Sequence, residues 1–144
     1  VFPRSEAADW IAEKIELNQG ATVIILDDDV SIHNAWEVRF KDYIGIICLK
    51  SFKIAEEAIE FINAADKDKL FLLIDFELIK QKLSGLQVIE QTSMQRSSIL
   101  VTSHYAHKNI QDLATKAGVK ILPKQLSPEV PIEIRENSAD KRRN

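Results

Sequence analysis

Polar side chains that could bind a metal ion or take part in catalysis follow four apolar runs of the 144-residue chain. The acidic triplet 27–29 follows the first run, Asp75 a later one, and Thr102 and Lys124 follow two more. Carboxylates placed close together repel one another and raise one another's pKa, and a hard divalent cation such as Mg²⁺ relieves that repulsion. With a hydroxyl and an ammonium, such a site suits phosphoryl transfer, with Asp75 as the nucleophile.

The apolar runs predict the elements that position these residues. Each run has the unbroken apolar character of a strand buried on both faces, and patterns typical of amphipathic helices separate the runs. This alternation predicts βαβ units and an α/β, doubly wound parallel sheet of five strands. Carboxyl ends of parallel strands share one edge, so Asp27 and Lys124 are expected to meet there. The predicted strands are 22–26, 44–49, 70–74, 99–101 and 119–122.

The two ends of the chain have other patterns. Residues 1–20 are predicted to be a linker or a short amphipathic helix over about 7–17. Pro128 and Pro131 leave little room for a helix after the fifth strand, so the last helix is predicted to be truncated or missing. The domain itself is expected over 21–135, and the polar residues 136–144 are predicted to form a disordered tail. Cys48, the one cysteine, is predicted to pack inside the second strand and excludes an internal disulfide.

The polar residues at the four strand ends, taken in chain order, resemble those of the receiver domains of two-component response regulators. The resemblance covers about 22–126 and implies a flavodoxin-like strand order, 2-1-3-4-5. It implies that Asp75 is the phosphoacceptor and that Thr102 and Lys124 assist it. It also implies a Mg²⁺ ion bound directly by Asp28 and Asp75, partly through water by Asp27, and by the backbone carbonyl of Glu77.

The same resemblance implies a role in signalling rather than a free-standing enzyme. The phosphoryl group would come from a histidine kinase or a phosphotransfer domain, and a downstream signalling protein would respond. A homodimer is left open as a further partner. Segments 9–11, 14–17 and 27–33 resemble the C-terminal receiver module of hybrid sensor histidine kinases. The expected location is the cytoplasm, including the cytoplasmic end of a membrane-bound kinase.

Two other functions stay open at this stage. A degenerate receiver would bind partners without being phosphorylated. A phosphatase resembling the haloacid dehalogenases would use Asp27 as nucleophile and Asp29 as acid/base, but would leave Asp75 without a role. The net charge of −3 argues against direct nucleic-acid binding, and no apolar run approaches the roughly 20 residues of a membrane span.

We expect this domain to transmit its signal through other residues than those usual in the family. Ile121 lies three residues before Lys124, where receivers often have a switching Tyr or Phe. We therefore predict that a signal leaves through the loop 76–84 and through residues 103–110.

Overall fold

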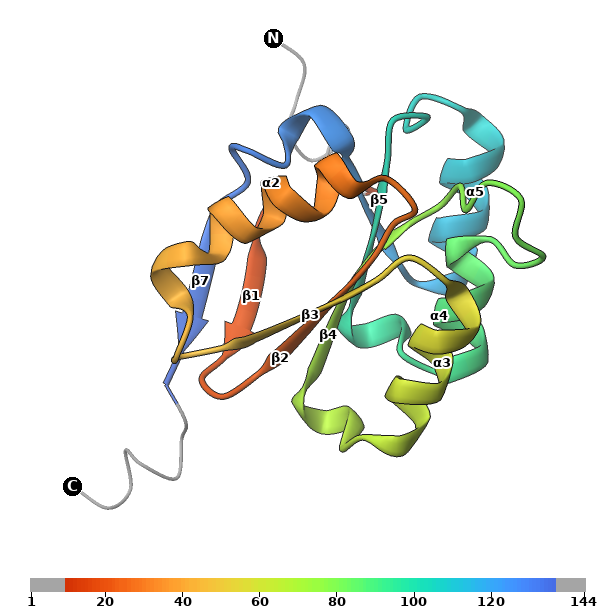
Figure 1. Ribbon diagram of the computed structural model, residues 1–144. Coiled ribbons are helices and arrows are strands. Elements are labelled where there is room, and N and C mark those ends of the chain that lie inside the picture. Colours follow the sequence, from red (N-terminus) through yellow and green to blue (C-terminus); the bar gives the residue numbers. More distant parts are fainter. Residues whose placement is uncertain (1–9, 137–144) are drawn as a thin grey trace, which may run out of the picture.

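A five-stranded parallel sheet forms the centre of the protein (Figure 1). The computed structural model describes residues 10–136. The spatial order is β3-β2-β4-β5-β6, which is 2-1-3-4-5 when these five strands are numbered along the chain, as predicted. All four pairings are parallel. The strands are β2 (Thr22–Leu26), β3 (Cys48–Phe52), β4 (Leu70–Asp75), β5 (Ser98–Thr102) and β6 (Lys120–Pro123).

Alternate side chains of the central strands feed two separate cores. Ile24 and Leu26 of β2 point toward α3 (Ala55–Ala64), α4 (Gly85–Thr92) and α5 (Lys108–Ala117). Val23 and Ile25 point the other way, where Trp36 and Phe40 of α2 (Val30–Phe40) cover them. Both faces of β2 are therefore buried, which explains its unbroken apolar sequence. Four short 3₁₀ turns complete the helical segments: Lys41–Tyr43, Lys67–Lys69, Gln95–Ser97 and Lys124–Leu126.

A second, two-stranded parallel sheet lies where a closing helix would otherwise pack. It pairs β1 (Ile15–Asn18) with β7 (Ile132–Arg135). Ile15 and Leu17 are buried against the same core as α2. The truncated last helix is confirmed, because only a 3₁₀ turn separates β6 from β7.

The predicted N-terminal helix is wrong over the described residues. Ile11 bridges to Ile121 of β6, and residues 15–18 are strand. Ile15, Glu16 and Leu17 alternate buried, exposed, buried, which is the period of a strand with one covered face. Residues 1–9, and the tail beyond Glu136, lie outside the described residues.

The second predicted strand is displaced toward the C-terminus. It runs over Cys48–Phe52 rather than 44–49, and Ile44 and Ile46 are exposed. β3 is an edge strand, and Cys48 is exposed rather than packed inside, because only one neighbour covers this strand. Among the described residues, no helix combines the length and the apolar character needed to cross a membrane.

Candidate functional site

Asp27 and Asp75 lie side by side at the carboxyl edge of the main sheet. Leu26 of β2 is in register with Ile74 of β4, so the residue that follows in each strand is an aspartate. The two residues are only 2% and 6% exposed. Asp28 is half-buried beside them, and one carboxylate oxygen from each of the three acids lies within 4.8 Å of the others. The fold thus brings together the three acids that the sequence suggested as metal ligands.

Lys124 joins this cluster from the end of β6. Its Nζ lies 3.0 Å from Oδ2 of Asp27 and 3.4 Å from Oδ1 of Asp75. Burial alone would lower the pKa of Lys124, but the hydrogen bond to Asp27 and the charges of both aspartates outweigh it, and the pKa is raised above its ordinary value. The ammonium is therefore protonated at neutral pH and placed between two carboxylates.

One ammonium does not neutralise the cluster. Burial, and then the charge of Asp27, raise the pKa of Asp75 to about 7, although Lys124 and a hydrogen bond from the backbone of Glu77 oppose the rise. A carboxyl group whose ionisation is opposed by burial and by a neighbouring negative charge favours an added cation. Three oxygen donors at this spacing suit a hard divalent cation, so Asp27, Asp28 and Asp75 fit Mg²⁺.

Thr102 is completely buried at the end of β5, the strand next to β4. Val101 is in register with Asp75, so Thr102 follows one residue beyond the aspartate. Its Oγ1 accepts a hydrogen bond from the backbone N–H of His104 at 3.0 Å. A hydroxyl that accepts one hydrogen bond still has a proton to donate, which an oxyanion at Asp75 could accept.

The third acid of the triplet faces away from the cluster. Asp29 is exposed and caps α2, since its Oδ1 accepts hydrogen bonds from Ser31 N at 2.9 Å and from Ser31 Oγ at 2.8 Å. The hydrogen bonds from Ser31 lower its pKa. Behind the cluster, the buried ring of His33 lies with Nε2 2.6 Å from the backbone oxygen of Asp27. Asp29 therefore has a structural role, and His33 supports the backbone that carries Asp27.

Glu77 lies close to the site, in the loop after β4. Its backbone hydrogen-bonds Asp75, and its side-chain Oε1 lies 2.8 Å from Nε2 of His104. This pair links the loop after β4 to the loop after β5 across the mouth of the site. The role of the Glu77 carbonyl as a metal ligand stays a prediction.

Gly85 allows α4 to begin directly against β4, the strand that ends in Asp75. A Cβ atom there would lie 1.9 Å from the backbone oxygen of Asp75, a distance that no side chain could adopt. The loop between Asp75 and Gly85 is held by Gln81, whose amide accepts from Ala55 N and donates to Lys53 O, both at 2.8 Å. Sequence reasoning missed Gln81 and the Glu77–His104 pair, because no spacing rule joins residues on different loops.

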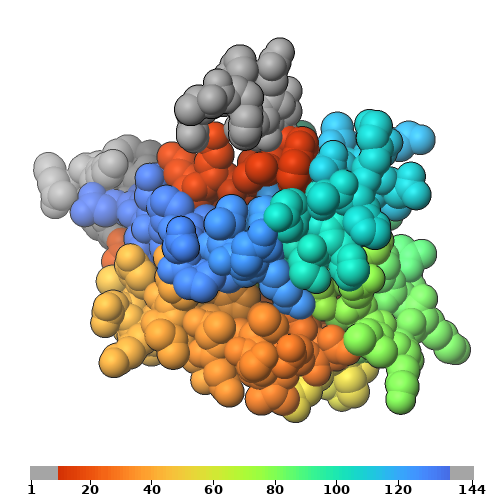
Figure 2. All heavy atoms as spheres, turned by 90° about the horizontal axis from the view of Figure 1, so that it is seen from above, coloured from red at the N-terminus to blue at the C-terminus, as the bar shows by residue number. Residues whose placement is uncertain are grey.

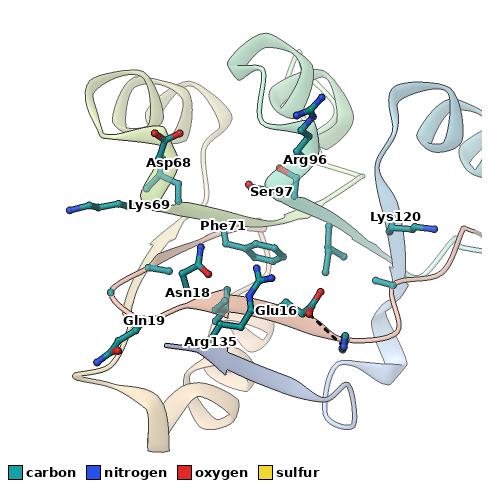
Figure 3. A pocket seen from close by; sticks show the side chains of 18 of the residues that line it. Glu16, Asn18, Gln19, Asp68, Lys69, Phe71, Arg96, Ser97, Lys120 and Arg135 are labelled. Carbon is teal, nitrogen blue, oxygen red and sulfur yellow. Dashed lines mark ion pairs between the residues drawn. The ribbon is translucent and has the colours of Figure 1, made fainter. Parts of the chain in front are cut away.

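A separate groove of about 1240 Å³ lies at the opposite, amino ends of the strands (Figure 3). It runs between β1 and the beginnings of β4, β5 and β6, with Phe71 on its wall. Its rim carries both signs of charge, including Asp68, Lys69, Arg96 and Arg135. None of the clustered acids lines it, so this groove is distinct from the site at the carboxyl edge.

Comparisons with known proteins place this arrangement among solved structures. No family model matches the chain, and neither does the sequence of any curated protein. The chemotaxis protein CheY4 of Vibrio cholerae is similar in structure, with a TM-score of 0.57 and 16% identity over 72% of this chain and 84% of that one. A response-regulator receiver domain from Rhodospirillum rubrum gives a TM-score of 0.56 and 14% identity over 77% and 97%.

A third structure points the same way. The receiver domain of the Francisella response regulator 1452 gives a TM-score of 0.57 and 20% identity, over 72% of this chain and 83% of that one. At these identities the likeness establishes the fold. This chain has the fold of a response-regulator receiver domain.

Proposed function

We propose that this domain accepts a phosphoryl group on Asp75 in a magnesium-dependent reaction and passes the signal on through changed contacts. The observation that carries the proposal is the meeting of Asp75, Asp27 and Lys124 at one buried edge of the sheet. Three separate strands supply these groups, so the arrangement depends on the whole fold rather than on one local turn.

The chemistry follows from the positions of the side chains. A carboxylate oxygen of Asp75 attacks the phosphorus atom of a donor phosphohistidine, the P–O bond forms, and the P–N bond breaks. The electron pair leaves with the donor imidazole, which takes up a proton. Lys124, already near Oδ1 of Asp75, offers an ammonium to a phosphoryl oxygen. The hydroxyl of Thr102 offers a hydrogen bond to another.

Asp27, Asp28 and Asp75 would hold the Mg²⁺ ion, with the backbone carbonyl of Glu77 as a further ligand. Bound there, the ion would neutralise the charge that develops on the phosphoryl oxygens. The raised pKa of Asp75 supports this assignment, because a cation would return the carboxyl group to its ionised, nucleophilic form at neutral pH.

The partner proposed as donor is a histidine kinase or a phosphotransfer domain. Exposed apolar side chains lie on the same edge of the sheet as the cluster, in the segments that follow three of its strands. They are Val30 at the start of α2, Ile54 before α3 and Ile79 in the loop after β4. Such side chains around a charged site suit docking of a protein surface rather than of a small metabolite.

The phosphatase alternative finds no support in the site. It needs Asp29 as an acid/base close to the reacting group, yet Asp29 is exposed and engaged by Ser31 as a helix cap. A receiver that only binds partners is the alternative to test, because the same arrangement of side chains could exist in a domain that is never phosphorylated.

Intact-mass spectrometry after treatment with a small phosphodonor and Mg²⁺ tests the proposal. We expect one added phosphoryl group in the wild type and none in Asp75→Asn. Asp29→Asn is the matched control, because Asn also caps helices and this position faces solvent. It should be phosphorylated like the wild type. No labelling of the wild type by phosphodonor or kinase would favour the binding-only receiver, and labelling of Asp27 would favour the phosphatase.

A further inference from the structure

Residues 10–12 lie along the edge of β6, where Ile11 forms an isolated parallel bridge to Ile121. The N–H of Ile121 donates to the carbonyl of Trp10, and the N–H of Ala12 donates to the carbonyl of Ile121, both at 2.8 Å. The bridge is parallel, in the same sense as the rest of the sheet. The edge of β6, next to the end of the strand that carries Lys124, is thus covered by the N-terminal segment of the described chain.

Trp10 also contacts the loop that follows Thr102. Its ring stacks on Tyr105, with centroids 6.5 Å apart and planes inclined by 22°. Figure 2 shows the red N-terminal segment beside the teal loop after β5. The loop therefore touches the site at one end, through Thr102, and the N-terminal segment at the other, through Tyr105.

Two glutamines, one from α5 and one from the segment after β6, form hydrogen bonds with Tyr105. Gln111 donates to its backbone carbonyl at 2.7 Å, and Gln125 donates to its hydroxyl at 2.7 Å. Gln125 directly follows Lys124, the ammonium of the cluster. Tyr105 is thus linked to α5 and to the residue next to Lys124, whereas Ile121 of β6 has only a buried aliphatic side chain.

We propose that the segment 10–12 reads the state of Asp75 through Tyr105, and that the signal leaves the domain through the polypeptide before β1. This inference rests on the proposed phosphoacceptor function. A phosphoryl group on Asp75 draws the Thr102 hydroxyl toward its oxygens, and the N–H of His104 loses its acceptor. The loop 103–107 then rearranges, Tyr105 moves, and the Trp10 ring and the strand bridge at Ile121 loosen.

A switch requires two states that differ in their contacts, and the structure gives the contacts of the unmodified state. In the unmodified state Thr102 accepts from His104 and Trp10 stacks on Tyr105. In the modified state both contacts are lost. The element that carries the change is therefore the described segment 10–12, which is held against β6 in one state and loosened in the other.

Tryptophan fluorescence tests the inference, because the chain has two tryptophans and Trp36 is buried. The difference between the wild type and Trp10→Phe isolates the emission of Trp10. Beryllofluoride with Mg²⁺ mimics the phosphoryl group, and ¹⁹F NMR measures its binding independently. We expect acrylamide quenching of Trp10 to rise severalfold on loading, and the rise to be lost in Tyr105→Ala although loading persists.

Tyr105→Phe retains the ring and should retain the response, and Tyr43→Phe, at the other tyrosine, should leave it unchanged. If Tyr105→Ala does not fold, hydrogen exchange in the wild type decides instead. The amides of Ala12 and Ile121 should exchange severalfold faster on loading. Loading with unchanged quenching or exchange would overturn this inference alone. Absence of loading would overturn the phosphoacceptor proposal and this inference with it.

Discussion

The carboxyl edge of the main sheet and the β1–β7 layer are built in opposite ways. At the edge, carboxylates and an ammonium from three strands are buried together, and Asp75 is held with a pKa of about 7. In the layer, Ile15 and Leu17 are buried among apolar side chains. Electrostatic repulsion at the edge lowers the stability of the fold, and apolar burial in the layer offsets it.

The layer also shows how the chain does without a closing helix. Pro128 and Pro131 exclude a regular helix after β6. The guanidinium of Arg39, from α2, donates to the carbonyls of Ser127 and Val130 instead, and so fixes the turn that leads into β7. The face of the sheet is then covered by strands rather than by a helix.

The largest effect is expected at the edge, from Gly85→Ala. The added Cβ would meet the backbone oxygen of Asp75 at 1.9 Å, and a backbone atom cannot rotate away. Overpacking usually costs about 1–3 kcal/mol, and this contact should cost about 4 kcal/mol or more. Urea denaturation measures the change. A loss below about 1 kcal/mol would mean that α4 can move away from β4 without cost.

In the layer, Ile15→Ala should lower the free energy of unfolding by about 3 kcal/mol, as expected for a buried isoleucine. Its partner in register, Ile132, is only half-buried, so Ile132→Ala is the matched control with a smaller loss. Thermal or urea unfolding distinguishes the two. Equal and small losses would restore the linker or helix that the sequence predicted for this segment.

The sequence was most informative where apolar runs were continuous. Strands such as 22–26 and 70–74 are buried on both faces, so their composition alone identifies them, and the parallel topology then collects Asp27, Asp75 and Lys124. β1 was missed, although Ile-Glu-Leu alternates in the manner of a strand covered on one face. Residues 131–134 were expected to be extended, but their pairing with β1 was not predicted.

Contacts between loops could not be predicted at all. The stacking of Trp10 on Tyr105 joins residues 95 positions apart in sequence, and neither residue belongs to a regular pattern. Gln81, whose side chain accepts a hydrogen bond from Ala55 N at the start of α3, is a similar case. Such contacts depend on the conformation of several loops at once, which composition and periodicity do not encode.

The most direct test of the carboxyl edge is how the difference in stability between Asp75→Asn and the wild type depends on pH. Because the pKa of Asp75 rises from 3.8 to about 7 on folding, ionisation weakens the fold as the pH rises from about 4 to about 7, and the loss is complete above that. Asn cannot ionise, so without metal the variant should be more stable than the wild type by at most about 4 kcal/mol at pH 8 and by almost nothing near pH 4. Mg²⁺ should reduce this difference in stability, because it stabilises the wild type.

Asp29→Asn, at the exposed cap of α2, should show no such gain in stability at any pH. A constant difference between wild type and Asp75→Asn from pH 4 to pH 8 would mean that the buried carboxylates do not oppose one another, and the contrast between edge and layer would be lost.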